Sequence, residues 1–219
     1  CGGQNSYVYS DWGFLIPKKI IERASNHPLI VLFFKSLSEP LGIRHLTYTP
    51  LRHFPMTRIA PTEQDGRFRG QLIQGTVHDQ MAAILGGIAG HAGLFARTSD
   101  LAVLLQMNLW GGSYGGRQYL KPETIRYFTK LHDEGRHRGL GWDKVPADGR
   151  SNYVSYRASA NSYGHTGFTG AVAWVDPDED LLFVFLSNRI HPDPENGSIN
   201  SHHTRRKIHD LVYQSLLVQ

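Results

Sequence analysis

The sequence predicts an α+β fold in which an antiparallel sheet is flanked by helices. Three observations carry this prediction. Apolar residues recur with a helical period through the first part of the chain, they then gather in short runs typical of strands, and the last segment is again helical. Helices followed by a strand meander and a closing helix are an α+β layout. We expect one domain over residues 1–219, with a helical region at about 7–135 and the sheet plus terminal helix at about 136–219.

Five segments of the first region carry helix signals. Thr98-Ser99-Asp100 offers a capping residue, Gly111-Gly112 ends the helix that follows, and Pro122 suits a first helical position. The predicted helices cover residues 12–24, 28–37, 79–85, 98–110 and 121–132. Prolines at 50, 55 and 61 predict an irregular stretch that runs to about residue 75.

Four strands are predicted after about residue 136, where the spacing of apolar residues changes from a helical to a strand pattern. They cover residues 138–142, 162–166, 171–176 and 181–187. Pro177-Asp178-Glu179-Asp180 is a hairpin signal between the last two strands, and both of those are almost wholly apolar. Strands of that composition are covered on both faces. The helix predicted at 203–217 is expected to cover one face of the sheet.

Composition excludes several classes of protein. The 219 residues have a net charge of +4, and Arg205-Arg206-Lys207 is the densest basic cluster. This cluster is typical of a solvated helix face, because a nucleic-acid surface needs a longer basic stripe with interleaved aromatics. One cysteine permits no disulfide within the chain. The longest apolar run, 29–34, falls far short of the ~20 residues of a membrane span.

Two motifs point to a chemistry. Tyr9-Ser10-Asp11 and His165-Thr166-Gly167-Phe168 resemble the second and third signatures of the penicillin-recognising serine hydrolases, which include class C β-lactamases, DD-carboxypeptidases and related esterases. Residues 39–43, 90–95 and 139–142 support the resemblance, and residues 77–93 look like the DD-carboxypeptidase type. The chain also resembles β-lactamase-like domains that are fused to family 3 glycosidases. The resemblance implies a β-lactamase/transpeptidase-like fold.

The first signature of that superfamily, Ser-x-x-Lys, carries the nucleophile and does not occur in this sequence. We expect the fold to be incomplete at the N-terminus, and the 219-residue chain alone to be inactive toward esters and β-lactams. The resemblance implies that a serine forms an acyl-enzyme, which water then hydrolyses. A non-catalytic module that binds peptidoglycan peptides or a protein partner is the alternative.

The resemblance assigns Tyr9 as a base that shares proton transfer with the motif lysine. A phenol has an ordinary pKa near ~10, so it needs neighbouring cations to act in this way. Asp11 stands where asparagine is more usual. It could pair with the lysine or cap the helix that starts at Trp12, and the two roles are compatible.

His165 stands where β-lactamases commonly have lysine. It is expected to donate a hydrogen bond, to assist protonation of the leaving group, or to act as a cation near Tyr9. Thr166 and Gly167 would let substrate lie along the strand edge, and the resemblance implies that the Phe168 amide stabilises the oxyanion. Asp11 and His165 together favour DD-peptidase or esterase activity over true β-lactamase activity.

No cofactor and no metal are expected. Among the 12 histidines, His78, His91 and the His202-His203 pair with His209 are candidate ligands, and none has the spacing of a known zinc motif. Expected partners are a small-molecule or peptidoglycan-peptide substrate and, in the parent protein, an N-terminal segment or a fused glycosidase domain, without nucleic acid or a transmembrane segment. The resemblance implies a bacterial periplasmic or envelope-associated protein.

Overall fold

The computed structural model describes residues 8–132, 137–146, 148, 151 and 153–216. The chain divides into two compact units, residues 1–97 and 98–219. The boundary between the units lies earlier than the boundary predicted at about residue 135 between the helical region and the sheet. The reason is that helix α4 (Thr98–Leu109) packs on the sheet of the second unit.

The first unit begins with α1 (Trp12–Ser25) and α2 (Leu29–Phe33), and α2 continues as a π-helical turn at Phe34–Ser38. Both helices and α3 (Gln80–Ile84) confirm the predicted segments. The short strands β1 (Thr47–Tyr48) and β4 (Leu94–Phe95) pair antiparallel. Leu15 of α1 packs with Val77, Ala82 and Ala89 in a buried cluster, which joins α1 to α3 and to the loop that follows α3.

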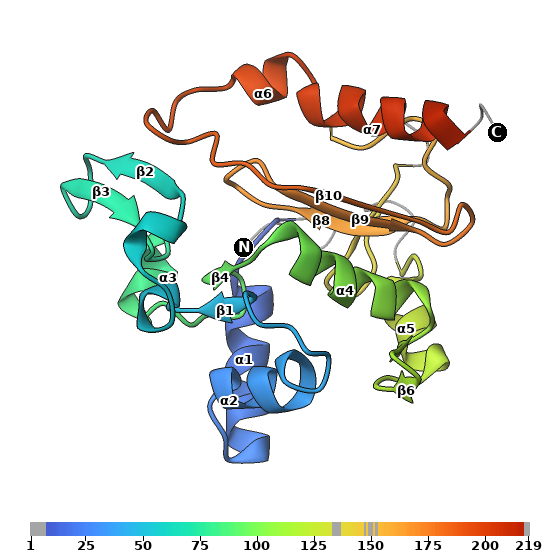
Figure 1. Cartoon of the computed structure of the whole chain (residues 1–219), viewed down its shortest axis with the longest axis horizontal. Helices are drawn as coiled ribbons and strands as arrows, with labels where there is room; N and C mark the ends of the chain where they lie inside the picture. Colours follow the sequence, from blue (N-terminus) through green and yellow to red (C-terminus); the bar gives the residue numbers. More distant parts are fainter. Residues whose placement is uncertain (1–7, 133–136, 147, 149–150, 152, 217–219) are drawn as a thin grey trace. The chain divides into compact units, whose positions relative to one another are not determined.

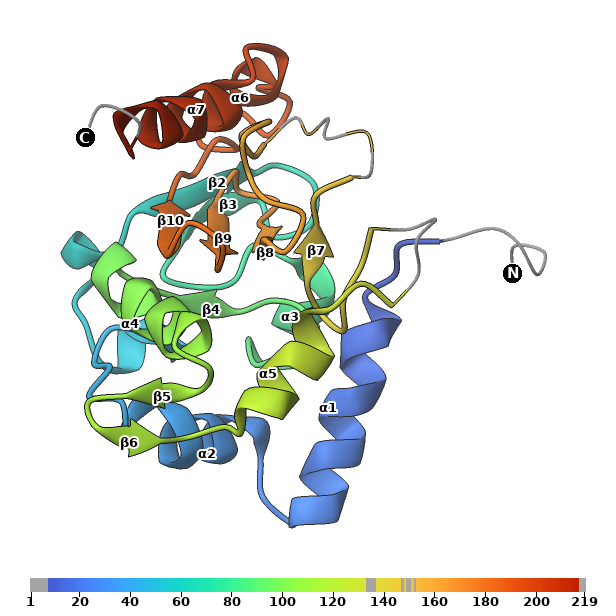
Figure 2. The same cartoon turned by 90° about the vertical axis from the view of Figure 1, so that its right-hand side faces the viewer.

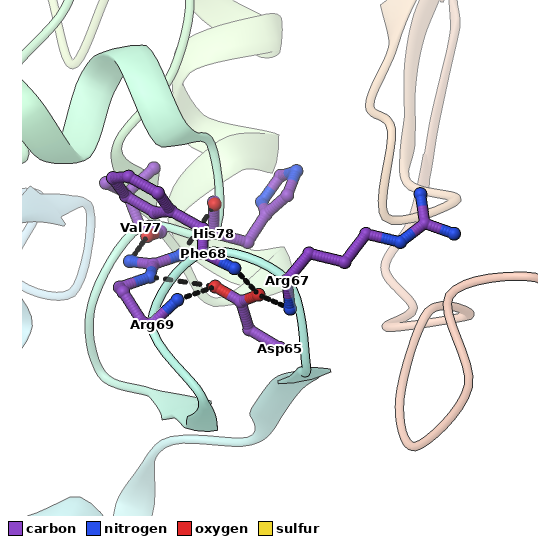
Figure 3. Close-up of polar contacts among 6 residues, drawn as sticks. All are labelled: Asp65, Arg67, Phe68, Arg69, Val77 and His78. Carbon is purple, nitrogen blue, oxygen red and sulfur yellow. Dashed lines mark hydrogen bonds and ion pairs between the residues drawn. The ribbon is translucent and has the colours of Figure 1, made fainter.

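The prediction of an irregular stretch up to residue 75 is wrong, because β2 (Pro61–Asp65) and β3 (Gln71–Gln74) form an antiparallel hairpin. Its strands are mostly polar, so no apolar alternation marks them in the sequence. Asp65 holds the turn by accepting bonds from the backbone amides of Arg67, Phe68 and Arg69, as Figure 3 shows. These bonds, that of Phe68 foremost, outweigh burial and hold the pKa of Asp65 well below its usual range.

The second unit is a four-stranded antiparallel sheet of order β10-β9-β8-β7. Its strands are β7 (Asp143–Lys144), β8 (Tyr163–Thr166), β9 (Val172–Asp176) and β10 (Leu181–Phe185). The last three and the hairpin between β9 and β10 confirm the prediction. Helix α5 (Pro122–Thr129) and the minor elements β5 (Ser113–Tyr114), β6 (Arg117–Gln118) and α6 (Ser198–Ser201) complete the unit with α4 and α7 (Thr204–Leu216).

The strand predicted at 138–142 is wrong. Arg138 makes only an isolated bridge to Asp143, and the strand itself starts at Asp143. Gly139 explains the difference, since a Cβ there would lie 2.6 Å from the carbonyl oxygen of Phe128. The segment packs as a tight turn against the end of α5 and bonds through the Leu140 amide to the same oxygen at 2.8 Å.

Both faces of the sheet are covered, as the apolar strands predicted. Figures 1 and 2 show α7 over one face and α4 over the other. Val172 and Trp174 pack in a cluster with Ile208 and Val212 of α7, whereas Val175, the next residue of β9, packs with Leu105 of α4. Successive side chains of a strand point to opposite faces, which produces this division. No helix among the described residues is long and apolar enough to cross a membrane.

Candidate active site

The first motif lies on an exposed loop directly before α1. The Tyr9 side chain is 58% exposed, and Asp11 occupies the position before the first helical residue. Asp11 has helical backbone angles (φ −64°, ψ −20°), and its carboxylate makes no capping bond. The hydroxyl of Ser10 instead accepts a bond from the Trp12 amide at 3.3 Å. The capping role considered for Asp11 is therefore wrong.

A histidine–aspartate pair belongs to the same unit, in which the His91 side chain is 5% exposed and the Asp79 side chain 28% exposed. Asp79 caps α3 by accepting the Ala82 amide at 2.7 Å on Oδ1, and the same oxygen lies 2.9 Å from Nε2 of His91. Burial acts to raise the pKa of Asp79, but the bonds from Ala82 and His91 together hold it below its usual value. Asp11 lies near this pair. The contact was not predicted, because α3 and the loop after it separate Asp79 from His91 in the chain.

The second motif lies on β8, where the sheet leaves part of an edge open. His165 and Thr166 pair with β9 on one side. On the other side β7 reaches only Tyr163 and Gly164, so within the described residues no strand pairs with the His165–Thr166 edge. Gly164 permits the close packing of β8, since a Cβ there would lie 2.3 Å from the Ala173 carbonyl oxygen.

The His165 ring is fixed by its own strand. Nδ1 lies 2.7 Å from the carbonyl oxygen of Thr166, and because a carbonyl only accepts, Nδ1 carries the proton of this bond. Nε2 lies 3.8 Å from Oδ1 of Asp143, and the His165 side chain is 31% exposed. In the neutral ring Nε2 holds a lone pair that can take up a proton. Once protonated, the ring faces a carboxylate.

Asp143 is buried on β7 and is held by two further groups. The guanidinium of Arg138 forms an ion pair with Oδ1, and the Tyr153 hydroxyl lies 3.4 Å from Oδ2. Burial, followed by the charge of Asp143, raises the pKa of Tyr153 to about 12, so the phenol stays a donor. Sequence reasoning missed Asp143. The available signal was a charged residue directly after the motif-like segment 139–142, which was assigned to a strand.

The loop after His165 and Thr166 is clamped by Arg189. The Nε of Arg189 donates to the Phe168 carbonyl oxygen at 2.9 Å, and its backbone amide donates to that of Thr169 at 2.9 Å. The guanidinium also lies 4.8 Å from the centroid of the Phe168 ring. The Gly167 amide bonds to the Ala171 carbonyl at 2.9 Å, which closes the turn. Arg189 was not predicted, since only the fold brings it to this loop.

The predicted site residues are divided between the units. Tyr9 and Asp11 lie in the first unit, whereas His165, Thr166, Gly167 and Phe168 lie in the second. Within its unit, the structure brings Asp11 to Asp79 and His91, and it brings His165 to Asp143. The catalytic roles assigned to these residues stay predictions.

Two solved structures share the fold. A mutant of simvastatin synthase from Aspergillus terreus has a TM-score of 0.68 at 17% identity, over 94% of this chain and 54% of that one. A hydrolase with promiscuous acyltransferase activity has a TM-score of 0.59 at 15% identity, over 92% of this chain and 56% of that one. Both structures confirm the predicted α+β fold, and the family match that follows confirms its β-lactamase-like type.

Sequence comparison identifies the family. The β-lactamase family model matches residues 4–204. A putative D-alanyl-D-alanine carboxypeptidase from Escherichia coli strain K12 is 37% identical over an alignment of 208 residues, and the match covers 88% of this chain and 48% of that protein. The chain thus spans about half the length of the curated relatives that it matches. The match over nearly the whole chain establishes that this protein belongs to the β-lactamase family, within the penicillin-recognising serine hydrolase superfamily.

Proposed function

We propose that this chain carries the tyrosine and histidine motifs of a serine acyl hydrolase of the DD-carboxypeptidase or esterase type. The observation that carries the proposal is the open His165–Thr166 edge of β8, next to the loop clamped by Arg189. An extended acyl substrate can add to such an edge through its backbone, as peptides add to exposed strands elsewhere. Its reacting carbonyl then lies near the Phe168 amide and the His165 ring.

The reaction follows from the motifs. The serine of a Ser-x-x-Lys segment outside these 219 residues attacks the carbonyl carbon, and Tyr9 shares with the motif lysine the removal of the serine proton. The Phe168 amide and the amide of the nucleophile stabilise the oxyanion, each worth about 2.7–4 kcal/mol in the transition state. The protonated His165 ring gives its Nε2 proton to the leaving group. Water then attacks the acyl carbon and gives one proton to Nε2 of His165, its oxygen leaves with the acyl product, and the serine regains the proton held by Tyr9 and the motif lysine.

The relatives support a substrate class. Those named D-alanyl-D-alanine carboxypeptidase favour a peptide that ends in D-alanine, and such a substrate belongs to the bacterial envelope. We therefore propose a periplasmic or envelope-associated protein. We further propose that the Ser-x-x-Lys segment lies outside these 219 residues, and the relatives' length, of which this chain spans about half, leaves room for it. A fused glycosidase domain stays a prediction from the sequence resemblance.

The test uses the full-length protein and the 219-residue chain side by side. We expect the full-length protein to hydrolyse a p-nitrophenyl ester or to release D-alanine from a D-Ala-D-Ala peptide, and the 219-residue chain to do neither. Tyr9→Phe and His165→Ala should each lower kcat/KM by about 100-fold or more. Tyr127→Phe, which removes the hydroxyl of a tyrosine that is 53% exposed on α5, is the matched control and should leave the rate unchanged.

Turnover by the 219-residue chain would overturn the claim that the nucleophile lies outside it. A full-length protein that lacks Ser-x-x-Lys and all turnover would overturn the hydrolase proposal. In that case the open β8 edge favours the alternative of a non-catalytic module. Equilibrium binding of a D-Ala-D-Ala peptide or of a protein partner would be the measurement for that alternative.

A further inference from the structure

One carboxylate oxygen of the second unit faces two basic side chains at once. Oδ1 of Asp143 forms an ion pair with the guanidinium of Arg138, and the same oxygen lies 3.8 Å from Nε2 of His165. The Asp143 side chain is 7% exposed, so protein groups supply most of its partners in place of water. His165 therefore faces an ion pair and not an isolated carboxylate.

Backbone bonds hold Arg138 beside Asp143. The two residues form an isolated antiparallel bridge, and the Arg138 carbonyl oxygen accepts the His132 amide at 3.0 Å. The Gly139 amide donates to the Trp142 carbonyl oxygen at 2.9 Å and closes the turn between them. None of these bonds uses the Arg138 side chain, which is 31% exposed. Substitution of that side chain therefore leaves the turn and the core in place.

The His165 ring can exchange a proton at one nitrogen only. Nδ1 donates to the Thr166 carbonyl oxygen at 2.7 Å, so a proton is taken up or released at Nε2, the atom that faces Asp143. A carboxylate within about 4–6 Å favours a protonated ring, whereas a nearby guanidinium opposes it. Because Arg138 binds the oxygen that faces Nε2, these two effects act in opposite directions on the same proton.

The other charged groups around this part of the second unit have partners of their own. Lys144 follows Asp143 on β7, so its side chain points to the opposite face, where its ammonium donates to the Asn161 carbonyl oxygen at 2.7 Å. Burial lowers the pKa of Lys144 to about 8, against the charges of Asp176 and Asp178.

Two further groups complete this environment. Arg189 is bound to the Phe168 carbonyl oxygen, and the Tyr153 phenol stays neutral beside Oδ2 of Asp143. Among the described residues of the second unit, Asp143 is the only carboxylate within ion-pair distance of the His165 ring.

We propose that Arg138 is a positioning residue for the reaction of this site, because its ion pair with Oδ1 of Asp143 neutralises the charge that faces Nε2 of His165. An unpaired carboxylate would hold the ring in its protonated form, whereas a paired one lets the ring both give and take up a proton. A group that is a proton donor in one step and is recharged in the next needs both forms. The inference rests on the proposed function, in which His165 alternates between these forms.

The experiment is an NMR titration of the His165 ring signals with pH in the 219-residue chain, assigned with His165→Gln. We expect Arg138→Gln to raise the titration midpoint by about half a pH unit or more, because the Asp143 charge is then unopposed. Arg138→Lys keeps a cation beside Asp143 and should restore most of the wild-type midpoint. Arg157→Gln removes an exposed arginine of the same unit, and this matched control should leave the midpoint unchanged.

Two further variants make the test independent of any one substitution. Arg138→Met keeps an unbranched side chain without a charge and should raise the midpoint as Arg138→Gln does. Asp143→Asn keeps an acceptor for Tyr153 and should lower the midpoint, since the guanidinium then acts on the ring without an opposing charge. Circular dichroism verifies the fold of each variant. Opposite shifts on loss of the cation and loss of the carboxylate are the signature of an ion pair that acts on His165.

The full-length protein supplies a second readout. The alkaline limb of its kcat/KM profile toward an ester should move to higher pH in Arg138→Gln, by about the shift seen in the NMR titration. A merely structural role of Arg138 would lower the rate at every pH and leave the limb in place. A shifted NMR midpoint with an unshifted limb would support the effect of Arg138 on the ring and overturn the step assigned to His165, so the two proposals fail separately.

Three outcomes of the NMR titration would overturn the inference. The first is an unchanged or lowered midpoint in a folded Arg138→Gln or Arg138→Met chain. The second is the same midpoint in Arg138→Lys and Arg138→Gln, which would show that the charge at this position has no effect on the ring. The third is an unchanged midpoint in Asp143→Asn, which would remove the carboxylate that links Arg138 to His165.

Discussion

His91 and His165 each lie beside an aspartate, and the two pairs differ in contact and in burial. In the first unit Nε2 of His91 bonds directly to Asp79 at 2.9 Å, and the ring is 5% exposed. In the second unit Nε2 of His165 lies 3.8 Å from Asp143, and the ring is 31% exposed. Asp79 also caps α3, whereas Asp143 is held by an arginine and a tyrosine of the second unit.

This difference separates two uses of the same pair of side chains. The direct contact of His91 with Asp79 joins the loop that carries the ring to the start of α3. The looser contact of His165 leaves Nε2 accessible beside an open strand edge while Thr166 fixes the ring plane. A group that must exchange protons with a substrate needs such access, and a group that holds a framework does not.

The largest expected effect is on the pair of His91 and Asp79. Asp79→Ala removes the cap of α3, which lowers the free energy of unfolding by about 1 kcal/mol. It also leaves the His91 ring without its partner, which lowers it by about 1–3 kcal/mol more. We expect the free energy of unfolding, measured with urea, to fall by about 3 kcal/mol. Asp79→Asn keeps an acceptor for both bonds and should lose about 1 kcal/mol or less. Equal losses in the two variants would contradict this account.

A third histidine extends the comparison, because His209 is buried and bonds to a backbone amide, whereas the other two contact aspartate. The Ser155 amide donates to its Nδ1 at 3.2 Å, so the ring is neutral. Burial lowers the pKa of His209 from 6.5 to about 4, against the opposing charges of Asp210 and Asp176. The unfolded chain therefore binds a proton more readily, and stability is lost as the pH falls from about 6.5 toward 4.

The measurement for His209 is urea unfolding at about pH 7.5 and about pH 5.0. We expect the wild type to lose about 2 kcal/mol more than His209→Gln over this range, since glutamine keeps an acceptor for Ser155 and does not titrate. A parallel loss in the two proteins would show that other groups cause the pH dependence.

The smallest expected effect is on the pair of His165 and Asp143, and we expect it in the rate of catalysis more than in stability. Asp143→Asn keeps an acceptor for Tyr153 and removes the charge that faces His165. We expect kcat/KM of the full-length protein toward an ester to fall about tenfold, equivalent to about 1.4 kcal/mol. Asp178→Asn, an exposed turn carboxylate, is the control and should leave the rate unchanged. An unchanged rate in Asp143→Asn would remove Asp143 from the site.

Local patterns predicted those elements whose signals are local. Helix α1 was predicted from its apolar spacing, α5 from Pro122, and β9 and β10 from apolar runs with a turn between them. The hairpin β2–β3 was missed because the bonds of Asp65 stabilise it in place of an apolar face. The strand expected before Asp143 was misplaced because the packing of Gly139 on α5 cannot be read from its neighbours in sequence.

The sequence by itself determined the family, the positions of its two motifs, and those helices and strands that have local signals, because each of these depends on residues close together in the chain. Only the tertiary structure decided which groups surround those motifs. Asp143 reaches His165, Arg189 reaches Phe168, and Asp11 reaches His91 through packing between segments far apart in sequence. Such contacts arise when apolar faces are buried together, and no local pattern encodes them.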